Sequence, residues 1–213
     1  MIDDLPSLLY LLAYDEAAGG PYDRSRARLL VRAAALVDLA MHGRLSEDGE
    51  GAVTVSGTRP TGDPVLDGVL RDATAGHGWK RLLRRHRKRT LTEVEDRLVA
   101  AGLLTARVPR APFATRRLAL TDHAATAAVR ARVSAALHGD GPVTEIPAAD
   151  AALLALAAAG GIRSVVSRRD RRALRARIDA CTRSLAVLAP GLEKAVRTLP
   201  TTMIAAQGGM GGG

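Results

Sequence analysis

The near-absence of aromatic side chains is the feature of this sequence that most restricts its fold. The 213 residues include one Trp, one Phe and three Tyr, so aliphatic side chains and alanine must form the core. Alanine, leucine and arginine favour helices, whereas strands favour aromatic and β-branched residues. A chain of this length forms one domain or at most two small ones. We therefore predict a mainly α, single globular helical domain with small β-hairpins, and we exclude a β-sandwich or barrel.

Apolar residues at helical spacing, together with turn residues, place the elements along the chain. Helices are predicted over residues 5–18, 25–41, 64–75, 79–89, 91–102, 122–137, 148–159, 168–188 and 192–199. Hairpins are predicted over residues 45–56 and from strands 105–108 and 113–118. No internal repeat or long linker divides the chain. We therefore expect one domain over residues 1–207 and a flexible Gly-rich tail over residues 208–213.

Three polar residues are predicted to cap helices. Asp63 precedes a proline, which is typical of an N-cap followed by the first helical position. Thr90 and Glu93 have the spacing of a capping box, and Thr121 precedes the next helix. An alternative for Asp63 is that it forms an acid–base pair of carboxylates with Asp67, but the cap explains it fully.

Positive charge is concentrated in the middle of the chain. Residues 76–132 hold fourteen Lys and Arg against four acidic residues, whereas the whole chain has a net charge of +9. Residues 80–89 alone contain seven permanent cations and no acid. Such a block predicts a surface that faces a polyanion, and the alternative is an ordinary solvated face. Trp79 borders the block, either as a core anchor or as a residue at a membrane interface.

Signatures of catalysis and metal binding are missing. There is no nucleophile elbow, phosphate-binding loop or dinucleotide fingerprint, and no two of the five His lie four residues apart. Cys181 is the single cysteine and is predicted to be a core residue rather than a nucleophile. We therefore predict no enzymatic activity, no cofactor and no metal. The lone cysteine and the acidic first residues are typical of a cytoplasmic protein without a signal peptide, and no apolar run could span a membrane.

Nucleic-acid binding is the weaker of two interpretations of the basic block. A helix over residues 91–102, a strand, a Pro/Arg turn, a strand and a helix also describe a winged helix. However, the first turns of that helix carry Glu93, Glu95 and Asp96, whose charges would oppose a phosphate backbone. The chain has no Asn and one Gln with which to read bases. Binding of anionic phospholipids is the stronger interpretation.

Several blocks resemble segments of the Golgi phosphoprotein 3 family, in the same order, over about residues 5–199. They are residues 36–45, 60–67, 95–104, 118–121 with 129–133, and 150–156. The most specific block is Pro-Thr-Gly-Asp-Pro-Val-Leu-Asp at residues 60–67, which is similar to the family's PTGD signature. The resemblance implies a helical domain that binds phosphatidylinositol 4-phosphate and acts as an adaptor for membrane proteins. Since the composition is typical of a high-GC bacterium, which has no Golgi, we expect a bacterial member on the inner face of the membrane.

The resemblance also implies which residues bind the headgroup phosphate. A gap-free alignment places family site residues on Arg32 and Lys88, whereas a second basic position falls on Leu91 and a Trp position on Asp23. Arg28 and Arg84, each one helical turn before a matched residue, are expected to supply the missing charge. Because Arg32 lies opposite the apolar face of its helix, we expect its replacement by alanine to leave the fold intact.

The second hairpin is the other site that the resemblance implies. In the family it takes part in membrane insertion and self-association. Its counterparts in this chain, predicted to contact the membrane, are Arg107, Val108, Arg110 and Phe113. The expected partners are thus anionic lipids with phosphoinositide-like headgroups, client membrane proteins and a second copy of the chain bound through the hairpin.

Overall fold

The computed structural model describes residues 3–57, 59–107 and 117–208. For residues 107 and 204–208 it describes the backbone but not the side chain. The helices are α1 (Leu5–Ala13), α2 (Arg24–Met41), α3 (Pro64–Ala73), α4 (Trp79–Arg84), α5 (Arg87–Ala100), α6 (His123–His138), α7 (Ala148–Gly160), α8 (Arg168–Ala173), α9 (Arg175–Ser184), α10 (Pro190–Arg197) and α11 (Leu199–Gly208). Short 3₁₀ helices are η1 (Val143–Glu145) and η2 (Leu185–Val187). The strands are β1 (Tyr14–Asp15), β2 (Gly20–Pro21), β3 (Leu45–Glu47), β4 (Val53–Val55), β5 (Leu104–Arg107) and β6 (Arg117–Leu120). The predicted mainly α fold with small hairpins is confirmed.

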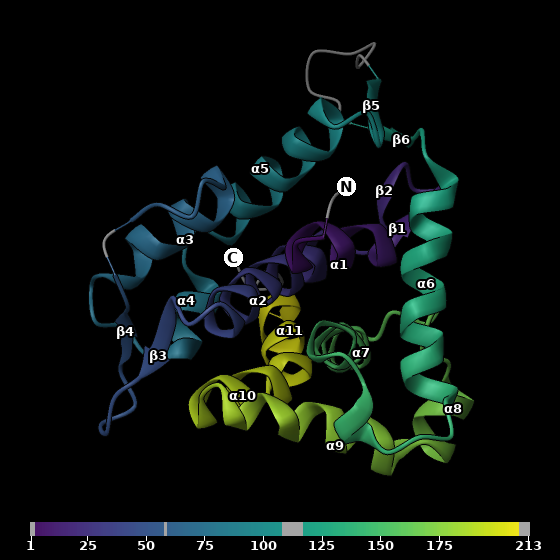
Figure 1. Ribbon diagram of the computed structural model, residues 1–213. Helices are drawn as coiled ribbons and strands as arrows, with labels where there is room; N and C mark the ends of the chain where they lie inside the picture. The colour runs from purple at the N-terminus through teal and green to yellow at the C-terminus, as the bar shows by residue number, and fades with distance from the viewer. Residues whose placement is uncertain (1–2, 58, 108–116, 209–213) are drawn as a thin grey trace.

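Helices α1, α2 and α7 form the centre of the molecule (Figure 1). Every residue of α1 is buried, as are residues 151–158 of α7. Leucine and alanine fill most of this space, and the small alanine side chains let the helices approach closely. At the end of α7, Gly160 lies so close to Leu30 of α2 that a Cβ atom would collide with the leucine side chain. The centre is therefore a tight crossing of helices that depends on small residues.

The other helices surround this centre. Figure 1 shows α3 and α5 on one side, α6 on the opposite side, and α8, α9 and α10 along a third edge. A second apolar cluster, which includes Tyr10, Leu91, Leu104 and Leu118, joins α1 and α5 to the hairpin of β5 and β6. The basic helix α5 and the hairpin therefore share one small core.

Three antiparallel hairpins connect the helices. The hairpin of β3 and β4 pairs Leu45 with Val55 and confirms the prediction for residues 45–56. The hairpin of β5 and β6 also forms, and its second strand continues to residue 120, two residues beyond the predicted end at 118, whereas residues 113–116 of the predicted strand lie outside the described residues. Leu118 is buried and Leu120 half-buried on the same face, so the alternation of these two residues fixes the strand. The pair β1 and β2 was not predicted, because each strand has only two residues.

The break between α4 and α5 differs from the prediction. The helix does not restart at Thr90 but at Arg87, after a turn at Arg85 and His86. The extended backbone of Arg85 (ψ 132°) ends α4, and His86, with φ 48° in the left-handed region, is the N-cap of α5. Thr90 lies inside α5, where its hydroxyl donates to the carbonyl of His86 at 3.3 Å. The predicted capping box is therefore wrong.

Two other boundaries are set by polar side chains. Asp63 caps α3 as predicted, accepting from the backbone N–H of Val65 at 2.8 Å. The cap of α6 is Asp122 rather than Thr121, whose hydroxyl instead lies 2.9 Å from that of Thr105 across the hairpin.

The predicted helix over residues 168–188 divides into α8, α9 and η2, and nothing in the local sequence explains this division.

Trp79 and Cys181 both belong to the core. Trp79 is 3% exposed, and its indole Nε1 donates to Glu47 Oε2 at 3.0 Å, so the membrane-interface alternative is wrong. The same carboxylate oxygen accepts from the backbone N–H of Gly191 at 2.7 Å and so ties α10 to the N-terminal half. Cys181 is fully buried, and burial raises the pKa of its thiol. The prediction of a core cysteine is confirmed.

Candidate anion-binding surface

The segment of α4, the following turn and the first turn of α5 (residues 79–89) carries the cations that the sequence concentrates here. We call it the α4–α5 basic segment. Within the described chain, five of its cations make no hydrogen bond or ion pair through their side chains: Lys80, Arg81, Arg84, Arg87 and Lys88. All but Arg87 are exposed. Cations at the positive N-terminal end of α5 add to the local positive potential rather than offsetting it. The segment is therefore suited to attract an anion.

Asp72 of α3 holds the turn of this segment in place. Its carboxylate accepts from Arg32 Nη2 at 2.8 Å, faces His86 Nδ1 at 2.7 Å and lies 3.6 Å from Arg85 Nε. Burial on its own raises the pKa of Asp72, but the hydrogen bond with His86 and the charge of Arg32 outweigh it and hold the pKa below its usual value. Asp72 thus joins α2 and α3 to the α4–α5 turn.

Arg32 does not lie on an exposed polar face, and that prediction is wrong. Its side chain is 1% exposed, because α4 and α5 cover this face of α2. The guanidinium donates to the carbonyl of Leu82 at 3.0 Å, to Thr90 Oγ1 at 3.2 Å and to Asp72. Burial lowers the pKa of Arg32, although the charge of Asp72 acts in the opposite direction. Arg32 therefore stabilises the α4–α5 basic segment from the protein interior, and its charge is not exposed to solvent.

Arg24 and Arg28 precede Arg32 in α2 at intervals of four residues, and they have different environments. The guanidinium of Arg24 makes two hydrogen bonds to the carboxylate of Glu95, at 2.7 and 2.6 Å. Glu95 is fully buried and also accepts from the hydroxyl of Tyr10 at 3.1 Å. Burial, followed by the charge of Glu95, raises the pKa of Tyr10. Arg28 is half-buried and makes no hydrogen bond or ion pair in the part of the chain that is described.

The structure brings together the two regions that the sequence comparison assigned to the phosphate site. Arg32 contacts Leu82 and Thr90, and these residues lie two positions from Arg84 and Lys88 respectively. At two positions the chain lacks the site residue of the family, and the residues found there, Leu91 and Asp23, have structural roles. Leu91 is buried, and Asp23 caps α2 by accepting from the backbone N–H of Arg26 at 3.0 Å. Sequence reasoning missed Asp72 and Glu95, since no local pattern marks a long-range partner.

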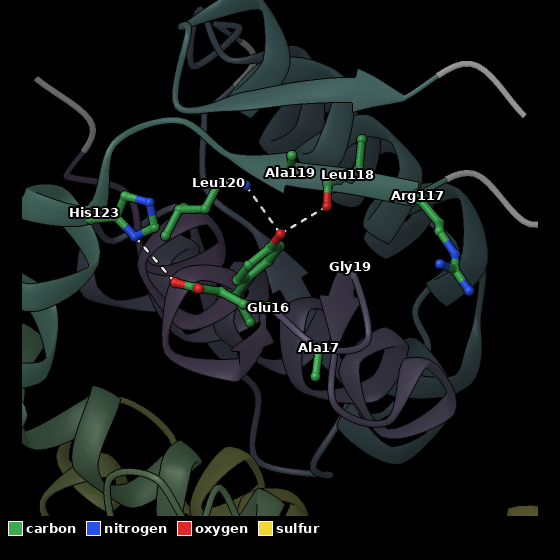
Figure 2. Close-up of a pocket in the computed structure, with 9 residues that line it drawn as sticks. Glu16, Ala17, Gly19, Arg117, Leu118, Ala119, Leu120 and His123 are labelled. Carbon is green, nitrogen blue, oxygen red and sulfur yellow. Dashed lines mark hydrogen bonds and ion pairs between the residues drawn. The ribbon is translucent and has the colours of Figure 1, made fainter.

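The base of the β5–β6 hairpin is fixed to the helical core. The hydroxyl of Tyr14 donates to the carbonyl of Leu118 at 2.8 Å and accepts from the N–H of Leu120 at 3.1 Å. Figure 2 shows this attachment beside a cavity of about 330 Å³, together with the ion pair of Glu16 and His123 at 3.1 Å.

The predicted membrane contacts of the hairpin lie mostly beyond the described chain. The backbone of Arg107 pairs with Arg117, and its side chain is not described. Val108, Arg110 and Phe113 lie outside the described residues, so their role stays a prediction.

The described residues contain no group of three or more His, Cys, Asp or Glu side chains that could hold a metal ion. None of their helices is both long and apolar enough to cross a membrane.

The pKa of Asp72 leads to a prediction about acid stability. Because this pKa is lower in the folded state than in the unfolded state, its stabilisation is complete above about pH 4 and is lost as the pH falls through the folded-state value. We expect Asp72→Asn to cost about 3–5 kcal/mol at pH 7, because it leaves the buried guanidinium of Arg32 without its ion-pair partner. The difference from the natural protein should shrink as the pH falls through the folded-state pKa of Asp72, because the carboxyl group is then protonated. Urea unfolding at several pH values measures this, with exposed Asp140→Asn as the control. A difference that is independent of pH would contradict it.

Comparisons with known proteins give one finding. The family model described as Golgi phosphoprotein 3 (GPP34) matches residues 5–199. A search of curated proteins found no match.

Proposed function

The chain belongs to the Golgi phosphoprotein 3 family, and from this we propose that it binds anionic phospholipid headgroups at the surface of a membrane. The observation that carries the proposal is the set of unpartnered cations on the α4–α5 basic segment. The ligand is a headgroup similar to that of phosphatidylinositol 4-phosphate. We further propose a non-enzymatic adaptor for membrane proteins, located in the cytoplasm against the inner face of the membrane.

The headgroup contacts are assigned to Arg84, Lys88 and Arg28. Arg84 and Lys88 are exposed, and all three side chains have unused donors in the described structure. Arg32 is reassigned from direct contact to positioning, because each nitrogen of its guanidinium already donates to a protein group. The Asp72–Arg32 pair then fixes the turn that presents Arg84 and Lys88. Preorganised cations lose less conformational entropy when they bind a phosphate.

Attachment by charge rather than by insertion follows from the packing of α4. Its apolar residues Trp79, Leu82 and Leu83 are buried in the core, so they cannot enter a bilayer without unfolding this helix. Each Lys or Arg near an anionic leaflet contributes about 1 kcal/mol. The end of β5 and the residues that follow it in the sequence, Arg107, Val108, Arg110 and Phe113, are proposed as a second membrane contact and as the surface for self-association.

Vesicle binding tests the proposed function. We expect Arg84→Gln/Lys88→Gln to bind anionic vesicles about thirtyfold more weakly, since two contacts of about 1 kcal/mol each are lost. The matched control is Arg169→Gln/Arg172→Gln, which removes the same charge from exposed positions on α8 and should change binding less than about threefold. The measurement is cosedimentation with neutral, anionic and phosphatidylinositol 4-phosphate vesicles at two salt concentrations.

Two outcomes of that experiment would contradict the proposal. One is equal binding to neutral and anionic vesicles. The other is an equal loss in both double variants, which would mean that net charge alone determines binding and that the α4–α5 basic segment forms no site.

A further inference from the structure

A second group of arginines surrounds a cavity formed by elements other than the α4–α5 basic segment. The cavity has a volume of about 300 Å³ and lies where the start of α2, the end of α7, α8 and α11 meet. Its lining includes four arginines and no acidic residue: Arg26, Arg163, Arg168 and Arg171. An adjoining cavity of about 570 Å³ shares Arg26 and Arg163 and adds Arg130. We call the first of these the arginine cavity.

The arginines of this cavity retain many unused donors. Arg163 and Arg168 are exposed and make no hydrogen bond or ion pair within the described part of the chain. Arg26 Nε is buried and lies 3.1 Å from Asp23 Oδ2 without the geometry of a hydrogen bond. Arg171 donates through Nη2 to the carbonyl of Ala158. Capping the carbonyl end of α7 explains Arg171, but it does not explain why Arg163 and Arg168 also line the cavity.

The acidic residues near the arginine cavity already have partners. Asp23 forms an ion pair with Arg26 at 3.1 Å, and Asp170 forms the capping box of α8 with Ser167, at 3.1 and 3.0 Å. In the adjoining cavity, Asp15 accepts from backbone N–H groups of its own turn, and Glu16 pairs with His123 at 3.1 Å. Asp23 offsets the charge of Arg26, but the guanidinium groups of Arg163, Arg168 and Arg171 repel one another unless an anion lies between them. The cavity is therefore a place where binding an anion relieves this repulsion.

Apolar residues, among them Val166 and Met203, also belong to the lining of the cavity. Apolar side chains beside guanidinium groups fit an organic group that carries phosphate, because arginine binds phosphate oxygens in a bidentate way. The volume lies at the lower end of the range of small-molecule sites. We propose that the arginine cavity binds a phosphorylated ligand with at least two negative charges, as a site separate from the α4–α5 basic segment.

Pyrophosphate is the probe for this site, because it carries the charge without a specific organic group. We expect the natural protein to bind it saturably at physiological salt, as measured by calorimetry. Arg163→Gln/Arg168→Gln should bind at least about tenfold more weakly, since charge-assisted contacts are lost. Arg169→Gln/Arg172→Gln removes the same charge from exposed positions outside the lining and should bind like the natural protein. Because all four residues are exposed, circular dichroism should show an unchanged fold in both variants.

Two further measurements identify the source of the phosphate and separate this proposal from the function proposed above: vesicle binding by Arg163→Gln/Arg168→Gln and pyrophosphate binding by Arg84→Gln/Lys88→Gln. If phosphatidic acid vesicles also bind Arg163→Gln/Arg168→Gln more weakly than the control, the ligand is a lipid headgroup. If vesicle binding is unchanged while pyrophosphate binding is lost, the ligand is a free phosphorylated molecule. Arg84→Gln/Lys88→Gln should bind pyrophosphate normally, even if it has lost vesicle binding. No saturable pyrophosphate binding by the natural protein, an equal loss in the lining and control variants, or a loss only in Arg84→Gln/Lys88→Gln would overturn the proposal.

Discussion

Arg32→Ala is expected to lower the free energy of unfolding by about 3–5 kcal/mol, the usual cost of breaking a buried ion pair. The side chain is 1% exposed, and its loss leaves the carbonyl of Leu82 and the hydroxyl of Thr90 without this donor. Urea unfolding monitored by circular dichroism measures the change. The matched control is Arg28→Ala, one helical turn away, where a half-buried side chain without an ion pair should cost less than about 1 kcal/mol.

Equal losses in the free energy of unfolding of the two variants would show that the buried hydrogen bonds and ion pair of Arg32 add no more stability than a half-buried arginine does. The expected difference also changes how binding experiments are interpreted. A loss of vesicle binding by Arg32→Ala would report a displaced α4–α5 turn or partial unfolding. Direct contact with a headgroup has to be tested at Arg28, Arg84 and Lys88 instead.

The pair of Arg24 and Glu95 should respond very differently according to which partner is removed. Glu95 is fully buried, so Arg24→Met leaves an ionised carboxylate with only the hydroxyl of Tyr10, at an expected cost of about 3–5 kcal/mol. Glu95→Gln should cost only about 1–2 kcal/mol. The amide oxygen can still accept from Tyr10, and the guanidinium of Arg24, with 29% of its side chain exposed, can be hydrated.

The double variant provides the check on this asymmetry. Arg24→Met/Glu95→Gln removes both charges and should be more stable than Arg24→Met alone, because no unpaired buried charge remains. The measurement is the urea unfolding of all three variants at pH 7. A Glu95→Gln variant that is as unstable as Arg24→Met would contradict the argument.

The local elements of the fold could be predicted from the sequence because their signals are local. The cap at Asp63 and the pairing of Leu45 with Val55 depend on residues within one turn or one hairpin. The break at His86 could not be predicted, since its left-handed backbone is held by Asp72 of another helix. The burial of Leu91 does not distinguish the two possible helix starts. A helix that begins at Arg87 and a helix that begins after Thr90 place Leu91 on the same buried face.

The candidate site was predictable only in part. Arg24, Arg28 and Arg32 have the same spacing and side chain, yet one pairs with a buried glutamate, one has no ion pair and one is buried. The partners that cause this difference lie far away in the chain. The same limit affected the argument from acidic residues against DNA binding. Glu95 was expected to face a phosphate backbone, but it is buried against Arg24 and faces no solvent.

The complete burial of α1 has a consequence for the synthesis of this chain on the ribosome. Helix α1 (Leu5–Ala13) packs against α2, but also against α6 and α7, and α7 ends only at Gly160. At the usual rate of about 5–20 residues per second, the remaining covering helices emerge on the order of ten seconds after α1. During that time its apolar surface is open to neighbouring nascent chains. Early folding of the N-terminal helices alone therefore cannot bury α1, which stays partly uncovered until the chain has been made as far as α7.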